Sequence, residues 1–133
     1  MKYASVILAN RHQNMLEGIR GLLETMFETV VMVADKASLF DAAEKICPDL
    51  AVVDLSLPVF GEINIARQLK DKCPDLKIII LSVHDEKTVV SDIMVSGVSG
   101  FVLKRSAASD LIPAVEKVFG GKTFVSPSLE YEF

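Results

Sequence analysis

The sequence predicts a single α/β domain built on a doubly wound parallel sheet. Three features support this class: short uninterrupted apolar runs, amphipathic segments with helical spacing between them, and prolines placed where a helix gives way to a strand. At 133 residues the chain has a common size for one domain, and half of its residues are hydrophobic, which is typical of a globular protein.

Apolar runs rich in Val and Ile mark the expected strands. These runs cover residues 6–9, 30–34, 50–53, 78–81 and 101–103. A sheet with one solvated face has strands that alternate between apolar and polar residues, whereas these runs are nearly continuous. Continuous runs are typical of parallel strands, so we expect helices on both faces of the sheet.

The segments between the runs carry apolar residues at helical spacing. The expected helices lie within residues 15–26, 39–46, 65–69, 89–94 and 111–118. Ser38 is a suitable N-cap for the second of them, because its hydroxyl could accept a hydrogen bond from a free helical N–H group. We expect the last helix to begin near Ser109, which would place Pro113 in its first turns, where proline is tolerated.

One helix-to-strand connection occurs twice. The sequence Cys-Pro-Asp-Leu occupies residues 47–50 and again residues 73–76, and in each copy the proline stops a helix just before a strand. We interpret the pair as a weak internal repeat of one βα unit rather than as a metal motif. We expect Cys47 and Cys73 to be free structural thiols, with a disulfide or redox role as the alternative.

Five strands alternating with five helices make a (βα)5 unit. Right-handed crossovers and two covered faces leave few topologies, and the flavodoxin-like strand order 2-1-3-4-5 suits this length. In such folds a ligand binds outside the carboxyl ends of the strands, at the switch point between strands 1 and 3. The chemistry of the protein is therefore expected at this edge.

Charge and hydropathy exclude two classes of partner for this segment. The net charge is −4, and no run of Lys or Arg is longer than the pair Lys104-Arg105, so binding to nucleic acid by this segment alone is not expected. No stretch approaches the ~20 apolar residues of a membrane span. The short apolar run near the N-terminus suits a first strand better than a signal peptide. We therefore expect a cytoplasmic protein.

Polar residues follow the strands at the predicted ligand edge. Asn10 and Arg11 come after the first strand, and Asp54 ends the third. Ser82 ends the fourth strand, and Lys104 follows the fifth. A carboxylate that accepts a phosphoryl group, with a hydroxyl and an ammonium to hold its oxygens, is a plausible chemistry for this set, because charge-assisted contacts to phosphate are strong.

Three segments at these strand ends carry a family resemblance: VVDLSLP around Asp54, IIILS up to Ser82, and GFVLKRS around Lys104. In register with the expected βα units, they resemble response-regulator receiver domains over residues 3–120. The resemblance implies that Asp54 is the phospho-acceptor, that Ser82 and Lys104 contact the phosphoryl group, and that Phe101 occupies the position of a switch aromatic, with plain core packing as the alternative. HQNMLEGIRGLLE and AVEKVFGGKTFVSP are similar to the NarL/FixJ subtype.

The pattern departs from the family after the first strand. Two acidic residues that normally hold Mg²⁺ are replaced by Asn10 and Arg11, so one positive charge takes the place of two negative ones. A guanidinium roughly 5 Å from Mg²⁺ would repel it by about 7 kcal/mol at an effective dielectric of ~20, whereas millimolar binding supplies only about 4 kcal/mol. We therefore expect no resident cofactor. If Mg²⁺ bound at all, Asp54 and the backbone of Ser56 would hold it. We hypothesise that Arg11 pairs with Asp54 in its place.

Metal sites built on histidine are not expected either. His12 and His84 each lie near the predicted site, but neither has a spacing that makes a metal cluster. His84 could instead affect the access of water or a kinase to the site.

The predicted function is a two-component signalling receiver with impaired Mg-dependent phosphorylation, and not an enzyme. We expect a receiver domain over residues 1–120, with 121–133 as a tail or the start of a linker to an effector domain. Expected partners are a histidine kinase or another signalling protein, and a second copy through the fourth helix, fifth strand and fifth helix. Three alternatives stay open: a conventional phospho-accepting receiver that controls a DNA-binding domain, a purely structural dimerisation domain, and a flavodoxin-like cofactor carrier.

Overall fold

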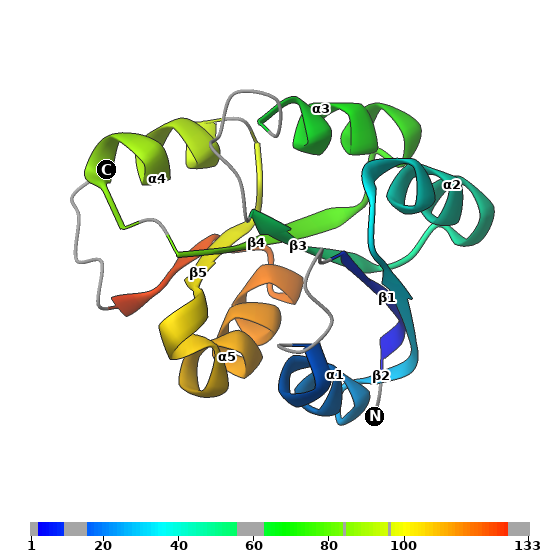
Figure 1. Ribbon diagram of the computed structural model, residues 1–133, viewed down its shortest axis with the longest axis horizontal. Helices are drawn as coiled ribbons and strands as arrows, with labels where there is room; N and C mark the ends of the chain where they lie inside the picture. Colours follow the sequence, from blue (N-terminus) through cyan, green and yellow to red (C-terminus); the bar gives the residue numbers. More distant parts are fainter. Residues whose placement is uncertain (1–2, 10–15, 56–62, 84, 96, 128–133) are drawn as a thin grey trace.

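The computed structural model describes residues 3–9, 16–55, 63–83, 85–95 and 97–127, in which strands and helices alternate (Figure 1). The strands are β1 Tyr3–Ala9, β2 Phe27–Val33, β3 Leu50–Leu55, β4 Lys77–Ser82, β5 Gly100–Leu103 and β6 Phe124–Val125. The helices are α1 Leu16–Glu24, α2 Lys36–Ile46, α3 Ile63–Lys72, α4 Lys87–Val95 and α5 Ala107–Phe119, and a short 3-10 helix, η2, spans Lys104–Ser106.

The described strands form one six-stranded sheet in the order β2-β1-β3-β4-β5-β6, and every neighbouring pair is parallel. The predicted fold class and the predicted order 2-1-3-4-5 are confirmed. From β1 the chain adds β2 on one side of the sheet, and it adds β3 to β6 in turn on the other side. The switch point therefore lies between β1 and β3.

Helices cover both faces of the sheet. Figure 1 shows α2, α3 and α4 on one side and α1 and α5 on the other. Side chains of β3 alternate between the two layers: Ala51 and Val53 belong to the core under α2, α3 and α4, whereas Leu50 and Val52 belong to the core over α1 and α5. All four residues are buried, which explains why the strand is apolar without interruption.

The sixth strand lies in a segment that the sequence pattern assigned to a tail or linker. Its backbone is bonded to β5: the N–H of Phe124 donates to the carbonyl of Ser99, and the N–H of Ser126 donates to the carbonyl of Phe101, both at 3.0 Å. A strand of two residues has no periodicity of its own, so only its partner strand reveals it. The domain boundary at residue 120 stays a prediction.

The second helix begins earlier than expected. Its N-cap is Asp35 and not Ser38, so the predicted cap is wrong. Oδ1 of Asp35 accepts a hydrogen bond of 2.7 Å from the backbone N–H of Ser38. Both residue types are good caps, but Asp35 has the extended backbone that an N-cap requires, with φ −146° and ψ 169°.

Replacing this cap should destabilise the protein in a pH-dependent way. The hydrogen bond from the Ser38 backbone lowers the pKa of Asp35. The stability that the ionised Asp35 cap contributes is therefore fully present above the unfolded-state pKa of about 3.9. This stability is lost as pH falls through the lower folded-state pKa. We expect Asp35→Ala to lower the free energy of unfolding at pH 7, and the difference from wild type to shrink near pH 2.5. Urea titrations at both pH values test this, with Asp35→Asn as an uncharged cap. An equal loss at both pH values would contradict it.

The last helix also begins earlier than the predicted Ser109. It starts at Ala107, directly after η2, and the N–H of Ala107 donates to the carbonyl of Lys104. Pro113 is therefore the seventh residue of α5 rather than part of its first turn. The ring of Pro113 lies on the exposed side of α5. Proline has no N–H, so the carbonyl of Ser109, four residues earlier and also exposed, lacks its helical donor. Water can satisfy that carbonyl.

The helices are short on the scale of a lipid bilayer. α5, the longest described, has 13 residues, whereas a membrane-spanning helix needs about 20. Within the described ranges no helix is long and apolar enough to cross a membrane.

Candidate functional site

Asp54 lies near the carboxyl end of β3, where the sheet order predicts a ligand site. Its neighbours in β3, Val52 and Val53, are buried, and across the ladder it pairs with Leu81 of β4. The carboxylate side chain is fully shielded from solvent. A buried carboxylate costs several kcal/mol of desolvation unless a counter-charge or hydrogen bonds compensate for it.

Lys104 supplies that counter-charge. It is the first residue after β5, and its Nζ lies 2.6 Å from Oδ2 of Asp54, with 8% of the Lys104 side chain exposed. The sheet order places β4 between the two strands that carry these residues, so the lysine side chain reaches across the end of β4. The predicted convergence of Asp54 and Lys104 is present in the structure.

Ser82 is the last residue of β4 and lies between the two charged residues in strand order. Its register partners are Leu55 of β3 and Leu103 of β5, the residues directly after Asp54 and before Lys104. The residue is fully buried. The three predicted site residues therefore lie on or directly after adjacent parallel strands, at one edge of the sheet.

Among the described residues, the carboxylate of Asp54 has unused hydrogen-bonding capacity. Oδ2 lies 2.6 Å from Lys104 Nζ as an ion pair, and neither oxygen accepts a hydrogen bond from a described residue. Buried polar atoms are usually satisfied, and exceptions are often associated with function. Oxygens with open lone pairs are what a phospho-acceptor presents to an incoming phosphorus atom.

Several predicted residues cannot be placed. Asn10, Arg11, Ser56, His12 and His84 lie outside the described residues. The hypothesis that Arg11 pairs with Asp54 therefore stays a hypothesis, and so does any role of Ser56 as a metal ligand. In the described part of the chain, the cation beside Asp54 is Lys104.

The described donors at this edge do not by themselves make the Mg²⁺ site that the family resemblance implies. Mg²⁺ takes oxygen ligands in octahedral geometry, usually from one or two carboxylates with water and phosphate. Here the Asp54 carboxylate already faces an ammonium at 2.6 Å, and among the described residues no group of three or more His, Cys, Asp or Glu could hold a metal. The sequence adds Asn10 and Arg11 where the family has acidic ligands.

Phe101 is fully buried on β5, in the core under α2, α3 and α4. Its register partners are Ile80 of β4 and Val125 of β6. The ring fills the core in this structure, and its role as a switch aromatic or as plain core packing stays a prediction.

Ser126 is a residue that sequence reasoning missed. It is buried, and its Oγ accepts a hydrogen bond of 3.0 Å from the N–H of Leu103, the residue before Lys104. The N–H of Ser126 in turn donates to the carbonyl of Phe101. Ser126 thus fixes the end of β5 from which Lys104 projects. Its only sequence signal is its place directly after β6, a strand that was itself not predicted.

Comparison with known proteins agrees with this arrangement. The response regulator receiver domain family matches residues 6–116. The chain is 30% identical over 128 residues to the transcriptional regulatory protein DegU of Brevibacillus brevis, covering 95% of this chain and 54% of that protein. It is 28% identical over 129 residues to the response regulator UvrY of Escherichia coli K12, covering 94% and 58%. The chain thus spans little more than half the length of these relatives.

Two solved structures extend the likeness to three dimensions. A LuxR-family two-component response regulator from Aurantimonas superposes with a TM-score of 0.86 at 27% identity, covering 97% of this chain and 93% of that one. The isolated receiver domain of RcsB from Salmonella, determined with the phosphomimetic BeF3⁻, superposes with a TM-score of 0.84 at 28% identity, covering 97% and 96%. Because the family match runs through every strand that carries a site residue, this chain belongs to the response-regulator receiver family, in its NarL/LuxR branch.

Proposed function

We propose that this chain is a signalling receiver rather than an enzyme with a metabolic substrate, and that Asp54 accepts a phosphoryl group poorly. The observation that carries the proposal is that Asn10 and Arg11 replace the two acidic residues that normally hold the metal. The buried contact of 2.6 Å between Lys104 Nζ and Asp54 Oδ2 already neutralises the remaining carboxylate before any phosphoryl group or metal arrives. The site is thereby stable in one arrangement without phosphate.

The charge around this pair argues against ordinary metal-assisted phosphorylation. A conventional receiver has two acidic residues after the first strand in addition to the phospho-acceptor. Together these carboxylates can neutralise both a lysine and a divalent ion. In this sequence Asn10 and Arg11 stand where those carboxylates would be. A divalent cation would then meet two cationic side chains and one carboxylate, an arrangement in which repulsion of several kcal/mol exceeds millimolar binding energy.

The chemistry itself remains available to Asp54. A carboxylate oxygen would attack the phosphorus of a donor, the bond from phosphorus to the leaving group would break, and the leaving group would depart with the electron pair. Lys104 could follow the new phosphoryl oxygens, because a lysine ammonium binds phosphate as a point charge. The proposal is thus one of slow transfer and not of an altered acceptor.

Intact mass after incubation with acetyl phosphate and Mg²⁺ tests the proposal. We expect wild type to be labelled at least about 100-fold more slowly than an ordinary receiver, since each 1.4 kcal/mol of lost metal binding is worth a factor of ten. Arg11→Asp should restore measurable labelling, because it removes the cation and adds an oxygen ligand. Asp54→Asn combined with Arg11→Asp should abolish the restored signal.

Two further variants separate the causes. Arg11→Gln removes the cation without adding a ligand, so its labelling should lie between wild type and Arg11→Asp. Arg20→Asp makes the same charge change on the exposed face of α1 and should leave labelling unchanged. Labelling of wild type at the rate of an ordinary receiver, lost in Asp54→Asn, would show that the chain is a conventional phospho-accepting receiver and would sink the proposal.

The output of the module is proposed by analogy with its relatives. DegU of Brevibacillus brevis is a transcriptional regulatory protein, and one structure similar to this chain is an RcsB–DNA complex. We propose that the state of this receiver controls such an output, with a kinase or another signalling protein as its input. A contact surface on α4, β5 and α5 stays a prediction. Val95 on α4, 76% exposed, is an apolar residue that such a surface could use.

A further inference from the structure

The two copies of Cys-Pro-Asp-Leu meet at the end of the molecule opposite Asp54. Cys47 directly follows α2, and Cys73 directly follows α3. These helices lie side by side on the same face of the sheet (Figure 1). Because the copies hold equivalent positions in consecutive βα units, their cysteines reach the same place at the ends of neighbouring helices.

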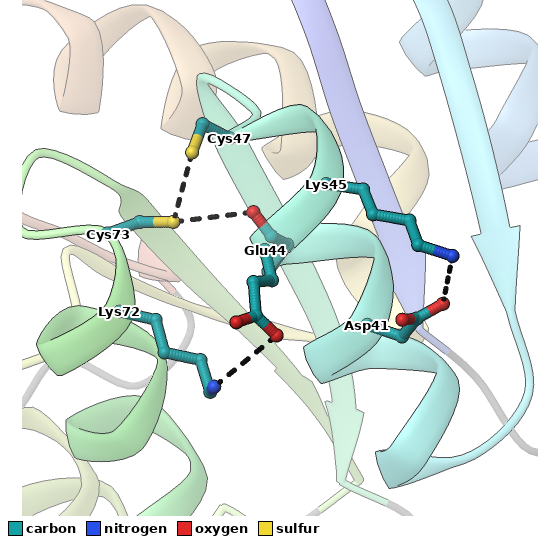
Figure 2. Close-up of polar contacts among 7 residues, drawn as sticks. Asp41, Glu44, Lys45, Cys47, Lys72 and Cys73 are labelled. Carbon is teal, nitrogen blue, oxygen red and sulfur yellow. Dashed lines mark hydrogen bonds and ion pairs between the residues drawn. The ribbon is translucent and has the colours of Figure 1, made fainter.

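The two thiols are in contact. Cys73 Sγ lies 3.7 Å from Cys47 Sγ and 3.4 Å from the carbonyl oxygen of Ala43, so its S–H can donate to either (Figure 2). An ion pair of 3.7 Å between Lys72 and Glu44 joins the same two helices beside the thiols. Two independent contacts therefore hold the ends of α2 and α3 together.

The sulfur atoms differ in exposure. Cys47 is exposed, whereas Cys73 is buried. Both line a pocket of about 350 Å³, together with Pro48, Pro74 and neighbouring residues. A small oxidant can therefore reach Cys47 from solvent, and the buried Cys73 sulfur lies 3.7 Å from the Cys47 sulfur.

We propose that Cys47 and Cys73 form a reversible intramolecular disulfide, which makes this end of the receiver a redox-sensitive site whose oxidant is a hydroperoxide. The Cys47 thiolate attacks the peroxide, so that an S–O bond forms and the O–O bond breaks. The departing hydroxide or alkoxide takes up the proton that the Cys47 thiol lost and leaves as water or alcohol. Cys73 then attacks the sulfenic sulfur; an S–S bond forms, the S–O bond breaks, and the departing hydroxide takes the Cys73 proton as water. Two thiols are oxidised and one peroxide is reduced.

Burial and hydrogen bonding fit this order of events. The pKa of Cys73 is raised, chiefly by burial and then by its hydrogen bond with Cys47. A thiol with a raised pKa is a weak first nucleophile, but it is suited to attack a sulfenic acid next to it. The exposed sulfur therefore reacts first, and the buried sulfur resolves it.

Closing the bond needs only a small movement. A disulfide has an S–S length of about 2.05 Å, so the sulfur atoms must approach by roughly 1.7 Å. Cys47 follows Ile46, the last residue of α2, and Cys73 follows Lys72, the last residue of α3. The movement therefore need not disrupt the interior of either helix. The bond would close a loop that contains β3 and α3, and so restrict the unfolded chain more than the folded one.

The inference does not rest on the proposed function. Asp54 is at the far end of β3, roughly 13 Å from Leu50 at about 3.3 Å per residue, and Cys47 lies beyond Leu50. The test below uses no phosphoryl chemistry. Failure of one proposal therefore leaves the other standing.

The test is to oxidise the reduced protein with hydrogen peroxide, quench with N-ethylmaleimide, and measure intact mass and non-reduced peptides. We expect wild type to lose both alkylatable thiols together, to lose two hydrogens, and to yield one cross-linked peptide pair joining residues 47 and 73. Dithiothreitol should restore both thiols. The midpoint of thermal unfolding should rise on the order of 10 °C on oxidation.

The matched control is Cys47→Ser, which changes an exposed residue and should leave the fold intact. After the same treatment, Cys73 of this variant should still react with N-ethylmaleimide when the protein is unfolded. The midpoint of thermal unfolding should not change. Cys73→Ser should instead collect a sulfenic acid or an intermolecular partner on Cys47. Wild type that keeps both thiols, that forms only intermolecular dimers, or that closes the bond only in urea would overturn the proposal.

Discussion

Lys104→Met should lower the free energy of unfolding by about 3 kcal/mol at pH 7. The side chain of Asp54 is fully shielded, and Lys104 Nζ at 2.6 Å is the cation that the structure places beside it. Met has a similar length and no charge, so the substitution leaves a buried carboxylate with no cationic partner among the described residues. Removing one member of a buried pair typically costs 3–5 kcal/mol, and we take about 3 because part of the lysine is exposed. Urea-induced unfolding followed by circular dichroism measures the change.

A double-mutant cycle isolates the ion pair from simple packing. Lys104→Met combined with Asp54→Asn should recover about half of the loss, since the second change removes the orphaned charge. Lys45→Met serves as the surface control: Lys45 pairs with Asp41 at 3.1 Å, but both side chains are exposed, and a change within about 0.5 kcal/mol is expected. A loss below about 1 kcal/mol for Lys104→Met would mean that another cation, for which Arg11 is the candidate, neutralises Asp54.

Phe101→Ala should cost still more, about 4 kcal/mol of unfolding free energy. The ring is fully buried in the core under α2, α3 and α4, between β4 and β6 in strand order. Replacing it with a methyl group removes buried apolar surface and leaves a cavity that rigid neighbouring strands cannot close. Urea unfolding measures the loss as a lower midpoint with little change in slope.

Val95→Ala is the matched control for the core substitution. Val95 lies at the end of α4 with 76% of its surface exposed, so its truncation should change stability by no more than about 0.5 kcal/mol. A loss below about 2 kcal/mol for Phe101→Ala would contradict the packing role. It would instead favour a ring that spends much of its time outside the core, as a switch aromatic does.

The positions of the first five strands, the parallel sheet and the edge at which the site lies were predictable from local pattern. Continuous apolar runs required two covered faces, and prolines at the helix-to-strand connections fixed the alternation. Asp54, Ser82 and Lys104 could be nominated because each ends or follows such a run, and parallel strands bring their carboxyl ends to one edge. These features depend on residues close together in the sequence.

Other features depended on partners that lie far away along the chain. β6 exists because two residues pair with β5, and Ser126 positions the end of β5 only once β6 is in place. At the second helix both Asp35 and Ser38 were chemically suitable caps, and the backbone conformation decided between them. Local propensity cannot resolve such choices, because their energies come from long-range contacts.

The sequence by itself determined the fold class, the strand order and the identity of the charged residues at the site. Only the tertiary structure decided which charges and thiols meet. Lys104 is separated from Asp54 by a whole strand, and the 2.6 Å contact arises from how far its side chain reaches across the end of β4. The cysteines looked like duplicates of one connection until α2 and α3 were packed side by side. Distances between residues far apart in the chain are set by packing, whereas residue type and spacing can be read directly from the sequence.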